Sequence, residues 1–174
     1  MPKKKGKTFP RRILGIDPGF GRLGIAVIEA RDGAWVPLCY GCLETKKSMP
    51  FTERLQALYT AVHDVVKKYK PTCATLEKLF FSKNVTTAIQ VGEARGVVLL
   101  ACADAGVPII ECTPNEVKQA VTGYGKADKK QIQQLVMMQL GISGKRMQDD
   151  AADALAIALA GGALHTWKAR TGRG

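Results

Sequence analysis

Residues 12–19 read Arg-Ile-Leu-Gly-Ile-Asp-Pro-Gly, a short apolar run that ends at an acid and a turn pair. This pattern predicts a β-strand that stops at Asp17, followed by a tight turn. A second apolar run, 24–30, alternates and is rich in β-branched residues, and a third run, 35–43, follows the turn Asp32-Gly33. Three such runs joined by short turns predict an antiparallel meander.

Strands and helices alternate along the rest of the chain. Apolar residues recur at helical spacing from Phe51 to Tyr69, and Pro71 closes that helix. The same patterns predict strands over 73–77 and 107–112 and helices over 85–105, 114–121, 129–140 and 149–164. We therefore expect an α/β fold in which a mixed sheet is covered by helices.

The size and charge of the chain limit its number of domains and the kinds of partner it can have. It has 174 residues, 46% of them hydrophobic, which suits one compact domain and no second one. Its formal net charge of +11 suggests a polyanionic partner, either nucleic acid or an anionic membrane surface. Much of the positive excess lies in two basic tails, 1–11 and 165–174, which we expect to be disordered, leaving 12–164 as the folded domain.

The sequence favours a cytoplasmic protein. No apolar run reaches the roughly 18 residues that span a bilayer, and the basic N-terminus lacks the hydrophobic segment of a signal peptide. The five cysteines are irregularly spaced, as expected of reduced, buried thiols. Cys39 and Cys42 have the spacing of a zinc pair, but no second Cys or His pair accompanies them, so we expect no zinc site. Because no apolar run is long enough to span a bilayer, we also expect no membrane partner.

The segment Gly19-Phe-Gly21-Arg-Leu-Gly24 matches a dinucleotide-binding fingerprint. That fingerprint has to open a helix, because the helix N-terminus holds the pyrophosphate. Here a predicted strand follows, so the glycines indicate a hairpin.

Several acids lie where a purely structural role is hard to find. Asp17 and Glu77 each end an apolar strand, where an unpaired carboxylate is costly to bury. Asp149, Asp150 and Asp153 begin an alanine-rich helix, where acids also cap the first turn and favour the helix dipole. Spacing does not choose among these three, since 150/153 and 149/153 both share a helix face.

Two strand-end acids and one or two helix acids can converge on a divalent metal. Mg²⁺ prefers carboxylate oxygens, and two such ions about 4 Å apart can activate a water and stabilise the leaving oxygen of a phosphodiester. The histidines, His63 and His165, lie near no candidate Ser or Cys nucleophile, so a histidine-based mechanism is not expected.

The sequence resembles the bacterial RuvC Holliday-junction resolvases from about Arg12 to Leu164. The matching motifs, in order, are Gly15-Ile-Asp17-Pro-Gly19, Leu76-Glu77-Lys-Leu-Phe80, Gly92-Glu-Ala-Arg95-Gly96, Val117-Lys118-Gln and Asp150-Ala-Ala-Asp153-Ala-Leu-Ala-Ile-Ala158. The resemblance implies an RNase H-like fold, with a five-stranded mixed sheet whose first three strands are antiparallel. The Lys-rich N-terminal extension departs from the family's usual short start.

The resemblance also implies the site residues. It identifies the catalytic and metal-binding acids as Asp17, Glu77, Asp150 and Asp153, and leaves Asp149 as a neighbour or cap. Some family members have His at the last of these positions.

Three further residues match family positions that meet DNA. Lys118 and Lys129 are expected to hold the scissile phosphate or offset charge in the transition state. Phe80 is expected to lie against a base at the junction crossover. For Phe81 a core role is favoured, and for Lys126 and Lys130 a solvated helix face.

The function implied is a homodimeric, Mg²⁺-dependent crossover junction endodeoxyribonuclease, with two ions per site and Mn²⁺ as a substitute. It would make paired symmetric nicks in four-way junction DNA during recombination and repair, leaving 5′-phosphate and 3′-hydroxyl ends. The small-residue helix 85–105 would form the dimer contact, and the RuvA and RuvB branch-migration proteins are candidate partners. The alternatives are an RNase H-like nuclease acting on RNA and a non-catalytic junction-binding protein.

Overall fold

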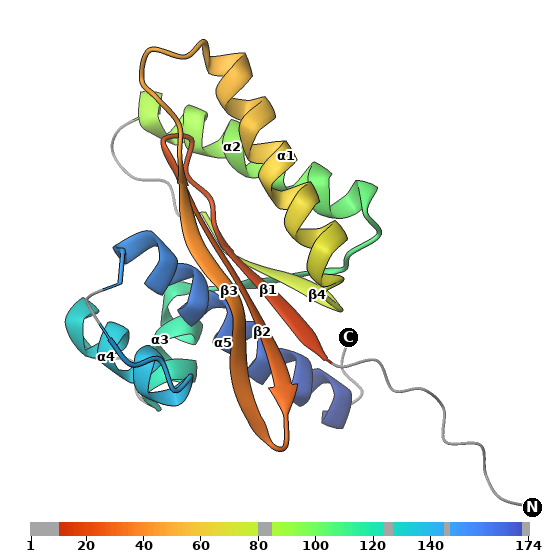
Figure 1. Ribbon diagram of the computed structural model, residues 1–174, viewed down its shortest axis with the longest axis vertical. Coiled ribbons are helices and arrows are strands. Elements are labelled where there is room, and N and C mark those ends of the chain that lie inside the picture. The colour runs from red at the N-terminus through yellow and green to blue at the C-terminus, as the bar shows by residue number, and fades with distance from the viewer. Residues whose placement is uncertain (1–10, 80–84, 124–126, 145–146, 172–174) are drawn as a thin grey trace, which may run out of the picture.

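The computed structural model describes residues 11–79, 85–123, 127–144 and 147–171. Its centre is a five-stranded sheet in the order β3-β2-β1-β4-β5 (Figure 1). The strands are β1 (Arg12–Asp17), β2 (Arg22–Arg31), β3 (Ala34–Glu44), β4 (Cys73–Glu77) and β5 (Ile109–Cys112). The first three pair antiparallel, whereas β4 runs parallel to β1 and β5 parallel to β4. The mixed sheet and the antiparallel meander predicted from the sequence are confirmed.

Helices cover both faces of this sheet. They are α1 (Phe51–Tyr69), α2 (Val85–Asp104), α3 (Pro114–Thr122), α4 (Lys129–Gln139) and α5 (Asp149–Thr171). Figure 1 shows α1 and α2 on one side of the sheet and α3, α4 and α5 on the other. Within the described part of the chain, no helix is long and apolar enough to cross a membrane.

The alternation of β1 divides the core between these two layers. Ile13 is fully buried in the cluster that includes the alanines of α5, whereas Leu14 and Ile16 are fully buried in the cluster beneath α1 and α2. Successive side chains of a strand point to opposite faces, so each residue of β1 belongs to one layer. A strand buried on both faces has to be apolar throughout, which explains the run Ile-Leu-Gly-Ile.

Helix α5 approaches the sheet closely at three glycines. A β-carbon at Gly15 would collide with the carbonyl oxygen of Ala154, and one at Gly24 with the carbonyl oxygen of Asp150. A β-carbon at Gly161 would strike the hydroxyl of Thr75. Glycine at these positions is therefore required by close approach, and it holds the start of α5 beside the end of β1.

A buried acid at the far end of the β1–β2 hairpin is fully paired. Glu29 is 4% exposed and lies opposite Arg12 in the strand register. Its carboxylate accepts a hydrogen bond of 2.6 Å from Arg12 Nε and another from Arg31 Nε. These two guanidinium groups lower the pKa of Glu29.

The last helix is longer than the sequence pattern predicts. The pattern ends the last helix at Leu164, but α5 continues to Thr171, into the segment expected to be a tail. The basic N-terminal segment, residues 1–10, lies outside the described residues.

Candidate active site

Two of the predicted acids meet because their strands are parallel neighbours. Asp17 ends β1 and Glu77 ends β4, and Ile16 lies opposite Leu76 in the register. The carboxyl ends of parallel strands meet at the same edge of a sheet, so the two acids leave the core side by side. This edge is also where functional side chains of α/β proteins commonly gather.

The backbone that carries Glu77 is held from helix α2. Arg95 is 8% exposed, and its Nη1 donates to the carbonyl oxygen of Glu77 at 3.3 Å. Its Nη2 pairs with Glu111 on β5. One buried guanidinium therefore ties α2 to the ends of two adjacent strands.

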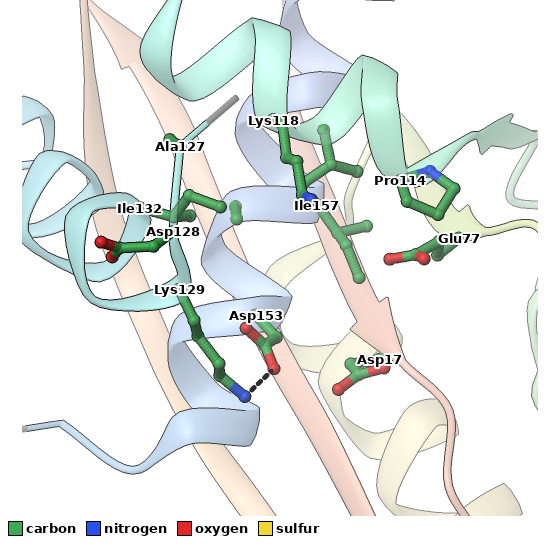
Figure 2. A pocket seen from close by; sticks show the side chains of 12 residues that line it. Asp17, Glu77, Pro114, Lys118, Ala127, Asp128, Lys129, Ile132, Asp153 and Ile157 are labelled. Carbon is green, nitrogen blue, oxygen red and sulfur yellow. Dashed lines mark hydrogen bonds and ion pairs between the residues drawn. The ribbon is translucent and has the colours of Figure 1, made fainter. Parts of the chain in front are cut away.

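A pocket of about 350 Å³ opens at this edge of the sheet (Figure 2). Its charged lining comes from five elements or their caps, and comprises Asp17, Glu77, Lys118, Asp128, Lys129 and Asp153. Its apolar floor includes Ile157 of α5 and Val117 of α3. Figure 2 shows the carboxylates of Asp17, Glu77 and Asp153 around one space, with Lys129 reaching toward Asp153. The structure thus brings together three of the four predicted acids and both predicted lysines.

Helix caps place the two lysines. Thr113 caps α3, accepting from the backbone N–H of Glu116 at 3.2 Å, and Lys118 follows within that helix. Asp128 caps α4, accepting from the backbone N–H of Gln131 at 2.8 Å, and Lys129 is the first residue of that helix. Both caps are capping boxes, which fix where a helix begins. Asp128 lines the pocket, and its role is this structural one.

Lys129 contacts two of the acids at the start of α5 directly. Its Nζ lies 3.1 Å from Asp153 Oδ2 and 3.6 Å from Asp149 Oδ2. The hydrogen bond with Asp153 is the main cause of the raised pKa of Lys129, with added attraction to Asp149. Lys118 contributes at longer range, where its charge opposes the rise in the pKa of Glu77.

The electrostatics of Asp17 set it apart from an ordinary surface acid. Burial, followed by repulsion from Asp153, Asp150 and Glu77, raises the pKa of Asp17 to about 6. Burial and then repulsion from Asp153 also raise the pKa of Glu77. The local cations do not cancel this repulsion, so the acids form a site that favours an additional positive charge.

Asp150 stands apart from the other three acids. It does not line the pocket with them, although its charge contributes to the raised pKa of Asp17. Its Oδ2 lies 3.8 Å from Arg22 Nη1, on the β2 side of α5. Asp149, which spacing alone could not distinguish from Asp150, pairs instead with Lys129.

Several expectations reach beyond these residues. Phe80, Phe81 and Lys126 lie outside the described part of the chain.

The sequence analysis did not predict a role for Arg22, which gives the acids a second cation. Its signal was a basic residue between Gly21 and Gly24, at the start of the second strand. Among the described residues, no group of three His, Cys, Asp or Glu side chains is gathered closely enough to hold a metal ion unaided.

Comparison with known proteins assigns the chain to a family. The sequence model of the RuvC family, described as crossover junction endodeoxyribonuclease RuvC, matches residues 13–161. The chain belongs to the RuvC family. The family and the enzyme class expected from the sequence are thereby confirmed.

Individual relatives agree with this assignment. The RuvC of Desulforamulus reducens is 49% identical over 147 residues, covering 84% of this chain and 90% of the relative. The RuvC of Thermotoga maritima is 50% identical, covering 84% and 88%.

Solved structures of RuvC match this family member along nearly its whole length. The structure of T. thermophilus RuvC in complex with a Holliday junction substrate is 34% identical, with a TM-score of 0.84, and covers 93% of this chain and 96% of that one. The yeast mitochondrial Holliday junction resolvase, 15% identical with a TM-score of 0.62, covers 86% of this chain and 77% of that one, and shows the shared fold alone.

Proposed function

We propose that this RuvC-family chain resolves Holliday junctions by metal-dependent hydrolysis of one phosphodiester bond in each of two opposed strands. The observation that carries the proposal is the convergence of Asp17, Glu77 and Asp153 with two lysines on one pocket. The junction-bound T. thermophilus relative supports the choice of substrate. Water attack would leave 5′-phosphate and 3′-hydroxyl ends, in the course of recombination and repair.

The acids fit a hard divalent cation. Asp17, Glu77, Asp150 and Asp153 offer only carboxylate oxygens, the ligands that Mg²⁺ prefers. Burial and then repulsion among these acids raise the pKa of Asp17, and a bound cation would relieve that repulsion. Mg²⁺ usually keeps several waters and takes the rest of its ligands from substrate phosphate, so it does not need a closed cage of side chains. Bound Mg²⁺, or Mn²⁺ in its place, would activate the attacking water and stabilise the leaving oxygen.

The protein's own groups orient and neutralise the substrate. Lys118 and Lys129 line the pocket from two different helices, where each ammonium can donate a hydrogen bond to a phosphate oxygen. Lys129 also holds Asp153 through its 3.1 Å contact, which keeps that carboxylate turned toward the pocket. Attraction to the phosphodiester that grows in the transition state would speed the chemical step.

We propose a homodimer formed through α2, so that two sites act on one symmetric junction. Ile89 and Leu100 of α2 are 59% and 54% exposed, and they lie about three helical turns apart on one face of the helix, where a second subunit could cover them. Phe80, close to the start of α2 in sequence, keeps its predicted role against a base at the crossover. RuvA and RuvB remain candidate partners.

The deciding experiment compares three labelled substrates, with and without Mg²⁺. These are a synthetic four-way junction, a linear duplex of the same sequence and an RNA–DNA hybrid. We expect paired nicks in the junction alone, only with Mg²⁺ or Mn²⁺. Cleavage of the hybrid would favour an RNA-directed nuclease, and tight junction binding without cleavage would favour a non-catalytic binding protein.

A further inference from the structure

Arg22 occupies the first position of β2, directly after the turn that follows Asp17. In the strand register it lies opposite Glu44, the last residue of β3. Its side chain is 63% exposed, and it lies outside the pocket that holds Lys118 and Lys129. Arg22 is therefore a cation at the border of the site that the expected mechanism does not use.

The partners of Arg22 are both acids, and both are held loosely. Its Nε lies 3.3 Å from Glu44 Oε1, and its Nη1 lies 3.8 Å from Asp150 Oδ2. The second distance is too long for a hydrogen bond. Ion pairs this exposed contribute little to stability, so another anion can displace either partner at little cost.

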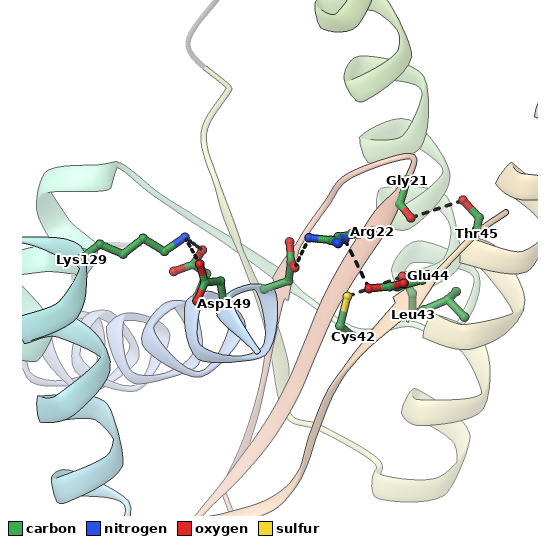
Figure 3. Close-up of polar contacts among 10 residues, drawn as sticks. Gly21, Arg22, Cys42, Leu43, Glu44, Thr45, Lys129 and Asp149 are labelled. Atoms are coloured by element: carbon green, nitrogen blue, oxygen red, sulfur yellow. Dashed lines mark hydrogen bonds and ion pairs between the residues drawn. The ribbon is translucent and has the colours of Figure 1, made fainter. Parts of the chain in front are cut away.

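Arg22 and Lys129 lie on opposite sides of the start of α5, as Figure 3 shows. Lys129 reaches the acids from α4, through Asp149 and Asp153. Arg22 reaches them from β2, through Asp150. A strand that places one phosphate in the pocket beside Lys129 would carry a neighbouring phosphate toward one side of the acids, and Arg22 is the cation available on the β2 side.

We infer that Arg22 binds a backbone phosphate of the junction strand adjacent to the scissile phosphate, and that Glu44 competes for it in the free protein. The inference rests on the proposed function. A guanidinium suits this task because its fork of N–H groups can meet two phosphate oxygens at once. A cation that neutralised Asp150 would weaken one of the two contacts that Arg22 now makes, and would leave the guanidinium freer to bind DNA.

The first test measures binding of a labelled four-way junction in EDTA by fluorescence anisotropy. Arg22→Gln should weaken binding about 5- to 10-fold and lower the slope of log K against log salt by about one, as expected for one lost phosphate contact. Arg31→Gln is the matched control, because it removes the same charge from the other end of β2, where Arg31 is also exposed. That control should change affinity by less than about twofold, since the charge it removes is distant and screened, whereas the loss of one Glu29 partner should show as lower thermal stability.

The second test asks whether Glu44 competes. Glu44→Gln should tighten junction binding about two- to threefold, because it frees Arg22 from an exposed pair. The gain should vanish when Arg22→Gln is also present. A gain of equal size in both backgrounds would mean that Glu44 merely repels DNA, and would overturn the proposed competition.

A third test locates the contact on the DNA. Junctions carrying a single neutral methylphosphonate at each position beside the cleavage site should bind wild-type protein more weakly at one position. Arg22→Gln should be insensitive to the substitution at that position, while Arg22→Lys should keep part of the sensitivity. Circular dichroism and thermal melting of each variant check that the fold is intact.

The outcomes separate this inference from the function on which it rests. Cleavage of the junction by wild-type protein, together with Arg22→Gln binding as tightly and with the same salt slope, would overturn the phosphate contact alone. Equal methylphosphonate profiles for wild type and Arg22→Gln would do the same, even where affinity falls, because the loss would then come from unshielded acids. Failure of wild-type protein to cleave the junction would instead count against the proposed function.

Discussion

The two ends of the β1–β2 hairpin hold acids in opposite electrostatic states. At one end Glu29 is buried between Arg12 and Arg31, and its pKa is lowered. At the other end, burial and then repulsion from three other acids raise the pKa of Asp17 to about 6. The same pair of strands therefore carries a satisfied acid and an unsatisfied one. The satisfied acid stabilises the fold, whereas the unsatisfied acid costs stability and provides a place for a cation.

The largest expected effect lies at the unsatisfied end. Asp17→Asn and Glu77→Gln should each lower junction cleavage by a factor of about 10³ or more, because each removes a carboxylate at nearly constant volume from the reacting site. Glu29→Gln is the matched control, a buried acid on the same hairpin that should keep its cleavage rate at temperatures where it is folded. The measurement is single-turnover cleavage with Mg²⁺. An Asp17→Asn protein with normal circular dichroism that still cleaved would refute the acid assignment.

A slightly smaller effect should follow from changing the spacing between α5 and β1. Gly15→Ala should destabilise the fold by about 2–4 kcal/mol and lower cleavage, since the new methyl group has to push away the carbonyl of Ala154. Gly41→Ala on β3, where a new β-carbon would meet no atom within 4 Å, should be neutral or stabilising, since glycine weakens the interior of a strand relative to alanine. Urea unfolding gives both values. Equal costs at the two positions would mean that close packing does not fix the acids.

The two ends should also respond to pH with opposite signs. Because the folded pKa of Asp17 lies above its unfolded value, ionisation of Asp17 costs stability as pH rises from about 4 to about 6. In EDTA above pH 6, the free energy of unfolding of Asp17→Asn should therefore exceed that of wild type by about 1–3 kcal/mol. This difference should shrink toward pH 4.

Glu29 shows the reverse sign. Its folded pKa is lowered, so its stabilisation is present above its unfolded pKa and is lost as pH falls through the folded value. Glu29→Gln should be less stable than wild type at pH 7, and the deficit should fade in acid. Urea titrations of both variants across this range supply the check. A stabilised Glu29→Gln, or a destabilised Asp17→Asn, would reverse the contrast between the two ends.

The smallest effect concerns the partial neutralisation by Lys129. Lys129→Ala should weaken junction binding in EDTA several-fold, about 1 kcal/mol, because it removes a phosphate partner and leaves Asp153 unshielded. Lys130→Ala, the next residue along α4, should change binding less, since Lys130 does not line the pocket with the acids. Anisotropy titrations at matched salt test the pair, and equal losses would show that only overall charge matters.

The sequence predicted the strand-end acids because their chemistry is local. An apolar run that ends in Asp17 or Glu77 predicts a carboxylate at the edge of a sheet, independently of the rest of the sequence. The choice among Asp149, Asp150 and Asp153 was not local, since helix spacing allowed two pairs. It came from the family resemblance, and in the structure Asp149 pairs with Lys129 while Asp153 also lines the pocket.

The position of Arg22 beside the acids was not predicted from the sequence for a similar reason. Its place beside Asp150 depends on the approach of α5 to Gly24 of β2, a contact between segments more than a hundred residues apart. The end of α5 was misjudged because the apolar pattern stops near Leu164, whereas the helix continues to Thr171. Apolar periodicity marks where a helix packs against the core, and it does not mark the residue at which the helix ends.

The close seating of α5 on the sheet also bears on how the sequence can drift. Gly15, Gly24 and Gly161 leave no volume for a side chain, and none of them is expected to meet substrate. Any replacement has to move the helix that carries Asp150 and Asp153, so such mutations would inactivate the enzyme while sparing every acid. In a library of single substitutions selected for junction resolution, these glycines should be nearly as intolerant as the carboxylates.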